Sequence, residues 1–334
     1  MKIEFRILAA AVALAAGAAG TAVAQDFTGG KNMRVVIGSS AGGGFDAFGR
    51  MVGRHLRMEI AGKPNVVVSN LPGAGSLKAV QSVRAQPTDG TYMVLFNPGQ
   101  ILNSLLQPKK VKFDFTKDVH FIGSATADAR VCHAWHTTGV KTLADLLKKS
   151  QFNTGHTGNT ASTYIDAAML KNLFGAKIKQ IVGYPGSTEQ RLAVERGELD
   201  GDCGSYDSVP QNWITDKKTN VFIRISRVSV PELKDVPHIA DFANDEQKKI
   251  ITLLTAHNLM FRPFIVSRKV PTERVAILRE AFWKTVNGKA FLAEAEKSKR
   301  TVIEPLRGED LEKMVAEMYA TPAELLPKAA GAVK

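Results

Sequence analysis

Short apolar runs alternate along this chain with longer runs of helical periodicity, and loops rich in small residues join them. This alternation constrains the fold, because strands that alternate with helices form parallel sheets with crossover helices. The pattern therefore predicts an α/β protein whose region from about Val230 onward is mainly helical. The expected strands are 33–37, 65–69, 91–96, 152–155, 179–183 and 199–203, and the expected helices are 45–58, 78–84, 142–149, 163–174 and 189–196.

Two further segments, 121–135 and 220–226, are interpreted as crossings between two sets of such units. The chain has 334 residues, which is too long for one compact core and favours two domains. We expect one lobe from 25–125 with 222–334 and a second from 126–221. Each lobe is predicted to hold a mostly parallel sheet flanked by helices, and the crossing strands are predicted to form a hinge.

The first residues have the features of a secretory signal peptide. Lys2 and Arg6 supply a positive start, 7–20 is apolar, and the small residues at 22–24 suit signal peptidase, so residues 1–24 are predicted to be cleaved before Gln25. The apolar run is shorter than the roughly 20 residues that span a membrane. We therefore expect a mature protein in the periplasm.

The basic residues of the chain are scattered. The formal net charge is +12, and loss of Lys2, Arg6 and Glu4 would leave +11. Lys and Arg are mixed with acidic residues, which is typical of a solvated surface and argues against a nucleic-acid site. The excess of positive charge favours long-range attraction of anions.

Cys132 and Cys203 are the only cysteines, and both fall in strand-like segments. In an oxidising compartment two such thiols more often pair than stay free, so we expect a disulfide. The alternative is two separate buried thiols, because sequence spacing does not show that the two residues lie close together.

Four loops with the sequences GGGFD, NPGQ, HTGNTAS and YPGST join a strand to a helix. In open α/β sheets the ligand crevice lies beyond the carboxyl ends of the strands. Helix N-termini there present free N–H groups and the positive end of the helix dipole, which favours an anion. Gly44 is predicted to allow both a positive φ and the close approach of an anion to the backbone.

Three other motifs are weaker. Residues 38–42 match the G-x-S-x-G nucleophile elbow with Ser40 as nucleophile, but the match lies on the first strand, where no earlier strands can build the hydrolase sheet. Residues 42–47 fit a dinucleotide fingerprint without the acidic residue that should follow the second strand. His133 and His136 would face opposite sides of a strand, which disfavours a metal site.

Several segments together resemble the Bug-type receptors of tripartite tricarboxylate transporters, which are periplasmic carboxylate-binding proteins. The segments that carry this resemblance are VVIGSSAGGGFDAFGR, VVSNLPGAGS, PTDGTYMVLF, VKTLADLL, TGNTAS, VGYPGS and PTERVAILREAF, and they extend over nearly the whole mature chain. Gly38 and Phe45 depart from the family, which usually has proline and a small hydroxyl residue there. These departures alter the pocket wall, so the ligand cannot be transferred from a relative.

The resemblance implies a two-lobed periplasmic-binding-protein-like fold that has no catalytic residues and no cofactor. It implies a monomer that captures a small carboxylate and delivers it to a membrane permease, or presents it to a membrane sensor. An exported serine hydrolase that uses Ser40 is the alternative from the enzyme class. The ligand-binding residues implied by the resemblance are Gly43, Gly44, Phe45, Asp46, Asn97, Gln100, Asn159, Thr160, Ser162, Tyr184, Gly186 and Ser187.

Overall fold

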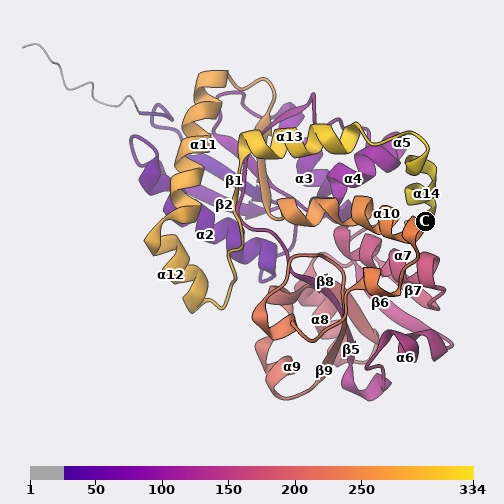
Figure 1. Ribbon diagram of the computed structural model, residues 1–334. Coiled ribbons are helices and arrows are strands. Elements are labelled where there is room, and N and C mark those ends of the chain that lie inside the picture. The colour runs from indigo at the N-terminus through magenta and orange to yellow at the C-terminus, as the bar shows by residue number, and fades with distance from the viewer. Residues whose placement is uncertain (1–25) are drawn as a thin grey trace, which may run out of the picture.

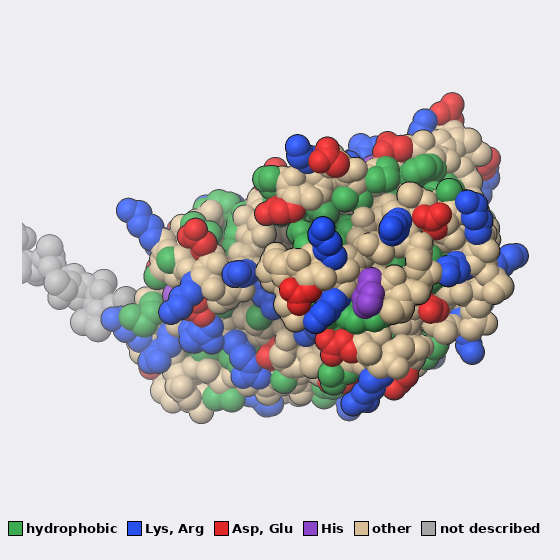
Figure 2. Space-filling view, turned by 90° about the horizontal axis from the view of Figure 1, so that it is seen from below, with side chains coloured by type: hydrophobic (Ala, Val, Ile, Leu, Met, Phe, Trp, Pro, Cys, Tyr) green, Lys and Arg blue, Asp and Glu red, His purple; other side chains and the backbone are tan. Residues whose placement is uncertain are grey.

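The alternating strand and helix patterns fold into two lobes, each built on one β-sheet (Figure 1). The computed structural model describes residues 26–334, so the predicted leader and its cut site before Gln25 lie outside the described residues. Within 26–334, no helix is both long and apolar enough to cross a membrane. On the face shown in Figure 2, Lys and Arg side chains are interspersed with Asp and Glu, as expected for a solvated surface.

The first lobe contains a six-stranded sheet with the strand order β11-β4-β10-β3-β1-β2. Alternate residues of β1 face opposite sides of this sheet: Val35 and Ile37 pack in the cluster that contains α2, whereas Val36 packs in the cluster that contains α3. The strands are β1 (Met33–Ile37), β2 (Val66–Asn70), β3 (Tyr92–Leu95), β4 (Val119–Ser124), β10 (Pro263–Ser267) and β11 (Leu306–Arg307). The helices around it are α2 (Gly44–Glu59), α3 (Leu77–Ser82), α4 (Gly99–Leu106), α5 (Pro108–Val111), α10 (Asp245–Thr255), α11 (Thr272–Asn287), α12 (Lys289–Lys297), α13 (Gly308–Tyr319) and α14 (Leu325–Ala332).

The second lobe contains a five-stranded sheet with the order β7-β6-β8-β5-β9. Its strands are β5 (Arg130–Trp135), β6 (Phe152–His156), β7 (Ile178–Val182), β8 (Gly201–Ser205) and β9 (Thr219–Arg224), and its helices are α6 (Leu143–Lys148), α7 (Ser162–Phe174), α8 (Ser187–Glu195) and α9 (Gln211–Thr215). Short 3-10 turns connect several elements, among them η1 (Ala74–Ser76), η2 (Val83–Ala85), η3 (His136–Thr138), η4 (Tyr206–Ser208), η5 (Pro231–Leu233), η6 (Ile239–Phe242) and η7 (Ala256–Met260).

The two-lobed α/β fold class is confirmed, with one difference in strand direction. Both sheets are mixed, because β10 runs antiparallel to β3 and β4 and because β5 runs antiparallel to β8 and β9. The expectation of a mainly helical C-terminal region did not include β10, which lies in the middle of the first sheet. All five of its residues are buried. A short apolar run of this length has no periodicity that distinguishes a strand from a buried helical turn.

The chain crosses between the lobes where the segments 121–135 and 220–226 were expected to cross. The first segment is two strands, β4 in the first sheet and β5 in the second, and residues 125–129 join them. The second segment begins with β9, which belongs to the second sheet and ends at Arg224. The division of the chain into lobes at residues 125 and 222 stays a prediction.

Cys132 and Cys203 are joined by a disulfide in the structure. They are directly opposite one another on the antiparallel strands β5 and β8, with Cα atoms 4.0 Å apart. Strand pairing therefore brings together two residues that are 71 positions apart in the chain.

We expect the double variant Cys132→Ala with Cys203→Ala to lose about 4 kcal/mol of unfolding free energy in urea, because it frees a long loop in the unfolded chain. Labelling of the denatured, unreduced wild-type protein with a thiol reagent should find no free thiol. Two labelled thiols, or a loss below about 1 kcal/mol, would contradict this account of the bridge.

Candidate ligand-binding cleft

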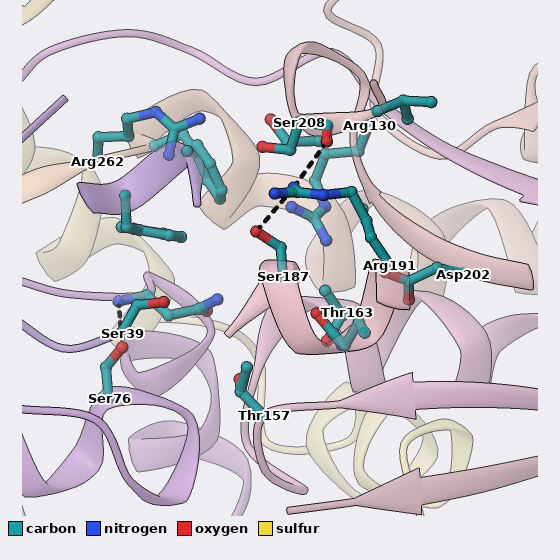
Figure 3. Close-up of a pocket in the computed structure, with 18 of the residues that line it drawn as sticks. Ser39, Ser76, Arg130, Thr157, Thr163, Ser187, Arg191, Asp202, Ser208 and Arg262 are labelled. Carbon is teal, nitrogen blue, oxygen red and sulfur yellow. Dashed lines mark hydrogen bonds between the residues drawn. The ribbon is translucent and has the colours of Figure 1, made fainter. Parts of the chain in front are cut away.

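A cavity of about 70 Å³ lies between the two lobes, which is room for several water molecules or a small organic acid. Figure 3 shows side chains from both lobes around it: Ser39, Ser76 and Arg262 come from the first lobe, and Thr157, Thr163 and Ser187 from the second. The cavity is therefore built only when the two lobes meet.

The lobes contact one another directly beside this cavity. The Ser40 N–H donates to the Pro185 carbonyl at 3.1 Å, and the Ser40 hydroxyl donates to Glu189 Oε2 at 2.8 Å. The Thr188 hydroxyl donates to the Ala41 carbonyl at 3.3 Å. The structure thus shows a closed arrangement of the glycine loop against the N-terminus of α8.

The environment of Ser40 bears on the hydrolase alternative. A serine nucleophile needs a general base within hydrogen-bond reach, usually a histidine. In the part of the chain that the structure describes, the hydroxyl of Ser40 bonds to a carboxylate of the other lobe and to no histidine. Ser40 therefore has a role in lobe contact and lacks the partner that a hydrolase would supply.

The glycine loop contributes Gly44 and Phe45 to the cavity lining. A Cβ atom on Gly43 would lie 2.6 Å from Ser187 Oγ of the other lobe, so Gly43 belongs to the lobe contact. Asp46 lies beneath the loop, where it accepts from Gly42 N–H at 3.0 Å and from Arg50 Nε at 3.0 Å. Burial opposes the ionisation of Asp46, but these bonds and one from Asn70 outweigh it and lower its pKa. Asp46 shapes the loop from below.

Asn97 lines the cavity, and three other predicted residues join the lobes beside it. Asn97 Oδ1 accepts from Ser162 N–H at 3.0 Å and from the Ser162 hydroxyl at 2.7 Å. Gln100 Nε2 donates to Thr160 Oγ1 at 2.7 Å. Gln100, Thr160 and Ser162 are fully buried or nearly so and are absent from the cavity wall.

The remaining predicted residues surround the start of α8 and α7. Ser187 lines the cavity, whereas a Cβ atom on Gly186 would lie 2.2 Å from Ser40 Oγ in the lobe contact. Tyr184 packs in a small cluster with Leu199 and Trp213, and Asn159 is exposed. The structure thus brings Gly44, Phe45, Asn97 and Ser187 to the cavity, and the ligand-binding role of all twelve residues stays a prediction.

Three arginines at the cavity were missed by the sequence analysis: Arg130, Arg191 and Arg262. Arg191 extends from α8 and is held by neutral groups. It donates to the Ser208 carbonyl at 3.0 Å and to the hydroxyl of Ser187 at 3.3 Å (Figure 3). No carboxylate among residues 26–334 forms an ion pair with it. Burial and the nearby Arg300 lower the pKa of Arg191, which is the environment that an anion would relieve.

Arg262 is only partly paired. Its Nη2 donates to Asp207 at 3.0 Å, while its Nε and Nη1 are buried without a hydrogen-bond partner in the described structure. The guanidinium carbon lies 4.4–5.0 Å from the ring centres of Phe45, Phe48 and Phe261. Arg262 has a φ of 58°, an uncommon backbone conformation for a residue other than glycine, and such strain concentrates at functional sites.

Arg130 is fully paired. Its Nη1 donates to Asp128 at 2.8 Å and its Nε to Asp166 at 2.7 Å, and all three side chains are buried. Asp128 lies in the crossing between the lobes and Asp166 lies on α7. Arg130 therefore ties the second sheet to the crossing and to a helix while one face of it lines the cavity.

Two further side chains in the cavity lining, Asp202 and His133, are not cations like the three arginines. Asp202 is partly exposed and lines the cavity, and its Oδ1 accepts from the Cys203 N–H at 2.8 Å. Burial raises the pKa of Asp202 to about 8 and lowers that of His133 to about 4. The described residues contain no cluster of side chains suited to hold a metal ion.

Several known proteins are similar to this chain in sequence or in fold. No protein-family model matches the chain. A UPF0065 protein in the tcbD-tcbE intergenic region of Pseudomonas sp. (strain P51) is 24% identical over 222 residues, and a UPF0065 protein in the TAR-I ttuE-ttuC' intergenic region of Agrobacterium vitis is 24% identical over 224 residues. Each match covers 65% of this chain and spans just under two thirds of the relative, 65% and 63% respectively.

Among solved structures, the periplasmic binding protein BugD aligns over 89% of this chain and 97% of its own, with a TM-score of 0.71 and 19% identity. MatC (Rpa3494) from Rhodopseudomonas palustris with bound malate aligns over 88% and 98%, with a TM-score of 0.71 and 16% identity. R. palustris Rpa4515 with adipate aligns over 90% and 97%, with a TM-score of 0.68 and 17% identity.

The chain therefore has the two-lobed fold of periplasmic binding proteins, with a cavity between the lobes. Within that class it resembles the Bug-type receptors, and the resemblance predicted from the sequence is confirmed.

Proposed function

We propose that this protein is a periplasmic solute-binding receptor that closes its lobes on a small carboxylate. The observation that carries the proposal is Arg191, a cation that lines the cavity and forms no ion pair with a carboxylate among the described residues. An unpaired charge is costly to bury, so a cation in this position favours an anionic ligand. The malate and adipate bound to two similarly folded proteins support this class of ligand.

Three features would hold the carboxylate. The first is the N-terminus of α2, whose N-cap Gly43 has no side-chain hydrogen bond and whose free N–H groups begin beside Gly44. The second is Arg191, and the third is the pair of unpartnered nitrogens of Arg262. Because Gly44 and Arg262 belong to one lobe and Arg191 to the other, an anion between them would draw the lobes together.

The wider setting follows from the leader and the resemblance. The leader-like residues 1–24 and the disulfide between Cys132 and Cys203 favour an oxidising compartment outside the cytoplasm. The resemblance to Bug-type receptors favours delivery to a permease of the tripartite tricarboxylate type, with the protein acting as a monomer without catalytic residues or cofactor. Presentation of the ligand to a membrane sensor would use the same closed form.

A thermal-shift screen over small carboxylates tests the proposal. A ligand present at a hundred times its dissociation constant adds about 2.7 kcal/mol of stability to the folded state. We expect at least one carboxylate to raise the melting temperature and the matched carboxamide to have no effect.

In Arg191→Met, the same carboxylate should bind about 10- to 100-fold more weakly, because charge-assisted hydrogen bonds are lost. Arg196→Met is the matched control, since it removes the same charge from an exposed position at the end of the same helix. Equal affinity of both variants for the carboxylate would remove Arg191 from the site.

A further inference from the structure

Most charged side chains around the cavity are engaged in ion pairs, and two are not. The carboxylates of Asp128 and Asp166 both pair with Arg130, and the carboxylate of Asp207 pairs with Arg262. Neither Arg191 nor Asp202 forms an ion pair with a described residue, yet both line the same cavity, where each influences the pKa of the other (Figure 3). The cavity thus presents one cation and one carboxyl group that have no direct ion-pair partner in the described structure.

The Asp202 carboxyl has a free oxygen. Its Oδ1 accepts from the backbone N–H of Cys203 at 2.8 Å, while Oδ2 has no hydrogen-bond partner in the described chain. The neighbouring Gly204 has no side chain, and even a Cβ atom built there would lie 4.0 Å from Oδ2. Burial raises the pKa of Asp202 to about 8 although Arg130 and Arg191 oppose the shift, so a further positive charge beside this carboxyl group would favour its ionised form.

His133 adds a second acceptor beside it. His133 and Asp202 are directly paired across β5 and β8, so they share one face of the second sheet. The Thr219 hydroxyl donates to the Ala134 carbonyl at 3.1 Å, which leaves the hydroxyl oxygen to accept from His133 Nδ1 at 2.8 Å. In this tautomer Nε2 carries no proton and acts as an acceptor. The ring is buried, lines the cavity, and makes no hydrogen bond through Nε2 in the described residues.

We infer that Asp202 and His133 form a subsite for a protonated amino group, and that the ligand is a zwitterion with both a carboxylate and an amine. The inference rests on the proposed function, because Arg191 and the α2 N-terminus take the carboxylate. A second carboxylate at this subsite would face two acceptors, His133 Nε2 and the ionised carboxyl group of Asp202. A protonated amine supplies hydrogen-bond donors to both acceptors and the positive charge that Asp202 lacks.

Matched pairs of carboxylates that differ only in the amino group test the inference. The probes are aspartate with succinate, glutamate with glutarate, and alanine with propionate, titrated calorimetrically into the full mature protein. In at least one pair we expect the amino compound to bind 10-fold or more tightly than its partner. Asp202→Asn keeps the shape and the bond from Cys203 N–H, and it should reduce that preference at least 10-fold.

Asp235→Asn is the control variant, because it removes one acidic charge at an exposed position, and it should keep the wild-type preference. If Asp202→Asn does not fold, His133→Phe removes the neighbouring acceptor and should weaken the amino compound selectively. An equal or reversed preference in the wild type, or a preference that survives both Asp202→Asn and His133→Phe, would overturn the amine subsite and leave the carboxylate receptor intact. If no member of any pair binds while simple carboxylates also fail in the thermal-shift screen, both the subsite and the proposed function are wrong.

Discussion

Gly44→Val should lose carboxylate binding by a factor of 100 or more, while the ligand-free protein keeps nearly all of its stability. A Cβ atom at position 44 would lie 2.5 Å from Ser208 Oγ and 2.7 Å from Arg262 Nη2. Ser208 belongs to the other lobe, so the valine side chain would hold the lobes apart and push Arg262 from the cavity. Loss of two charge-assisted hydrogen bonds is worth about 3 kcal/mol or more, which corresponds to this factor.

The reason for glycine at this position differs from the sequence-based expectation. A positive φ occurs at Gly42, where it is 83°, and not at Gly44, which is the first residue of α2. Glycine is required at position 44 because space is lacking there, and valine in a helix costs no more than glycine in backbone terms. Stability without ligand should therefore change by less than about 1 kcal/mol.

Two further variants make this prediction specific. Gly44→Ala should give an intermediate loss of affinity, because one methyl group meets the same atoms with less overlap. Ser40→Ala removes a single hydrogen bond between the lobes and should keep affinity within about tenfold. Calorimetric titration measures both, and a Gly44→Val protein with normal affinity would contradict the close approach of the lobes. A Ser40→Ala protein that binds normally but loses a measurable hydrolytic activity would favour the hydrolase.

Arg130→Met should be the most destabilising single substitution at the cavity, with a loss of about 3–5 kcal/mol in urea unfolding at pH 7.5. The reason lies in the two carboxylates that it would leave behind, since Asp128 and Asp166 are buried and Arg130 is the cation that forms an ion pair with both of them. Breaking a buried ion pair by removing one partner costs more than the pair contributes.

The pH dependence of this loss has a definite sign. Burial raises the pKa of Asp166 to about 6 even while Arg130 opposes the shift, and removal of Arg130 would raise it further. A carboxyl group with a raised pKa in the folded state stabilises the fold when protonated and loses that contribution as pH rises through the folded pKa. The loss of unfolding free energy caused by Arg130→Met should therefore become smaller as pH falls from 7.5 towards 5. Arg130→Lys keeps the charge and should lose less, and a Met variant with a loss below about 1 kcal/mol at pH 7.5 would contradict the buried network.

Sequence patterns predicted the elements of this fold better than its polar centre. Apolar runs such as 33–37 and 152–155 became strands within about two residues at each end. The strand β10 was not predicted because all five of its residues are buried, so the sequence shows no alternation of apolar and polar residues there. The four small-residue loops do meet between the lobes, as their positions at strand ends predicted, yet several of their residues, among them Gly43, Gly186 and Thr188, lie in the lobe contact and do not line the cavity.

The cavity arginines could not be found from the sequence for a physical reason. A charged residue in a single sequence shows no sign of burial, because burial depends on partners that come from distant segments. Arg262 pairs with Asp207 across 55 positions and Arg130 with Asp166 across 36. The chain carries 44 Lys and Arg residues, and only the fold separates the three at the cavity from those on the surface.

The most direct test of a carboxylate receptor is a calorimetric comparison of one carboxylate with its uncharged carboxamide, using the best compound from the thermal-shift screen. Both molecules have nearly the same size and shape, so only the charge that Arg191 and the α2 N-terminus would recognise differs. We predict that the carboxylate binds at least 100-fold more tightly, which corresponds to about 2.7 kcal/mol. Equal affinities for the two compounds, or binding of neither, would contradict the account.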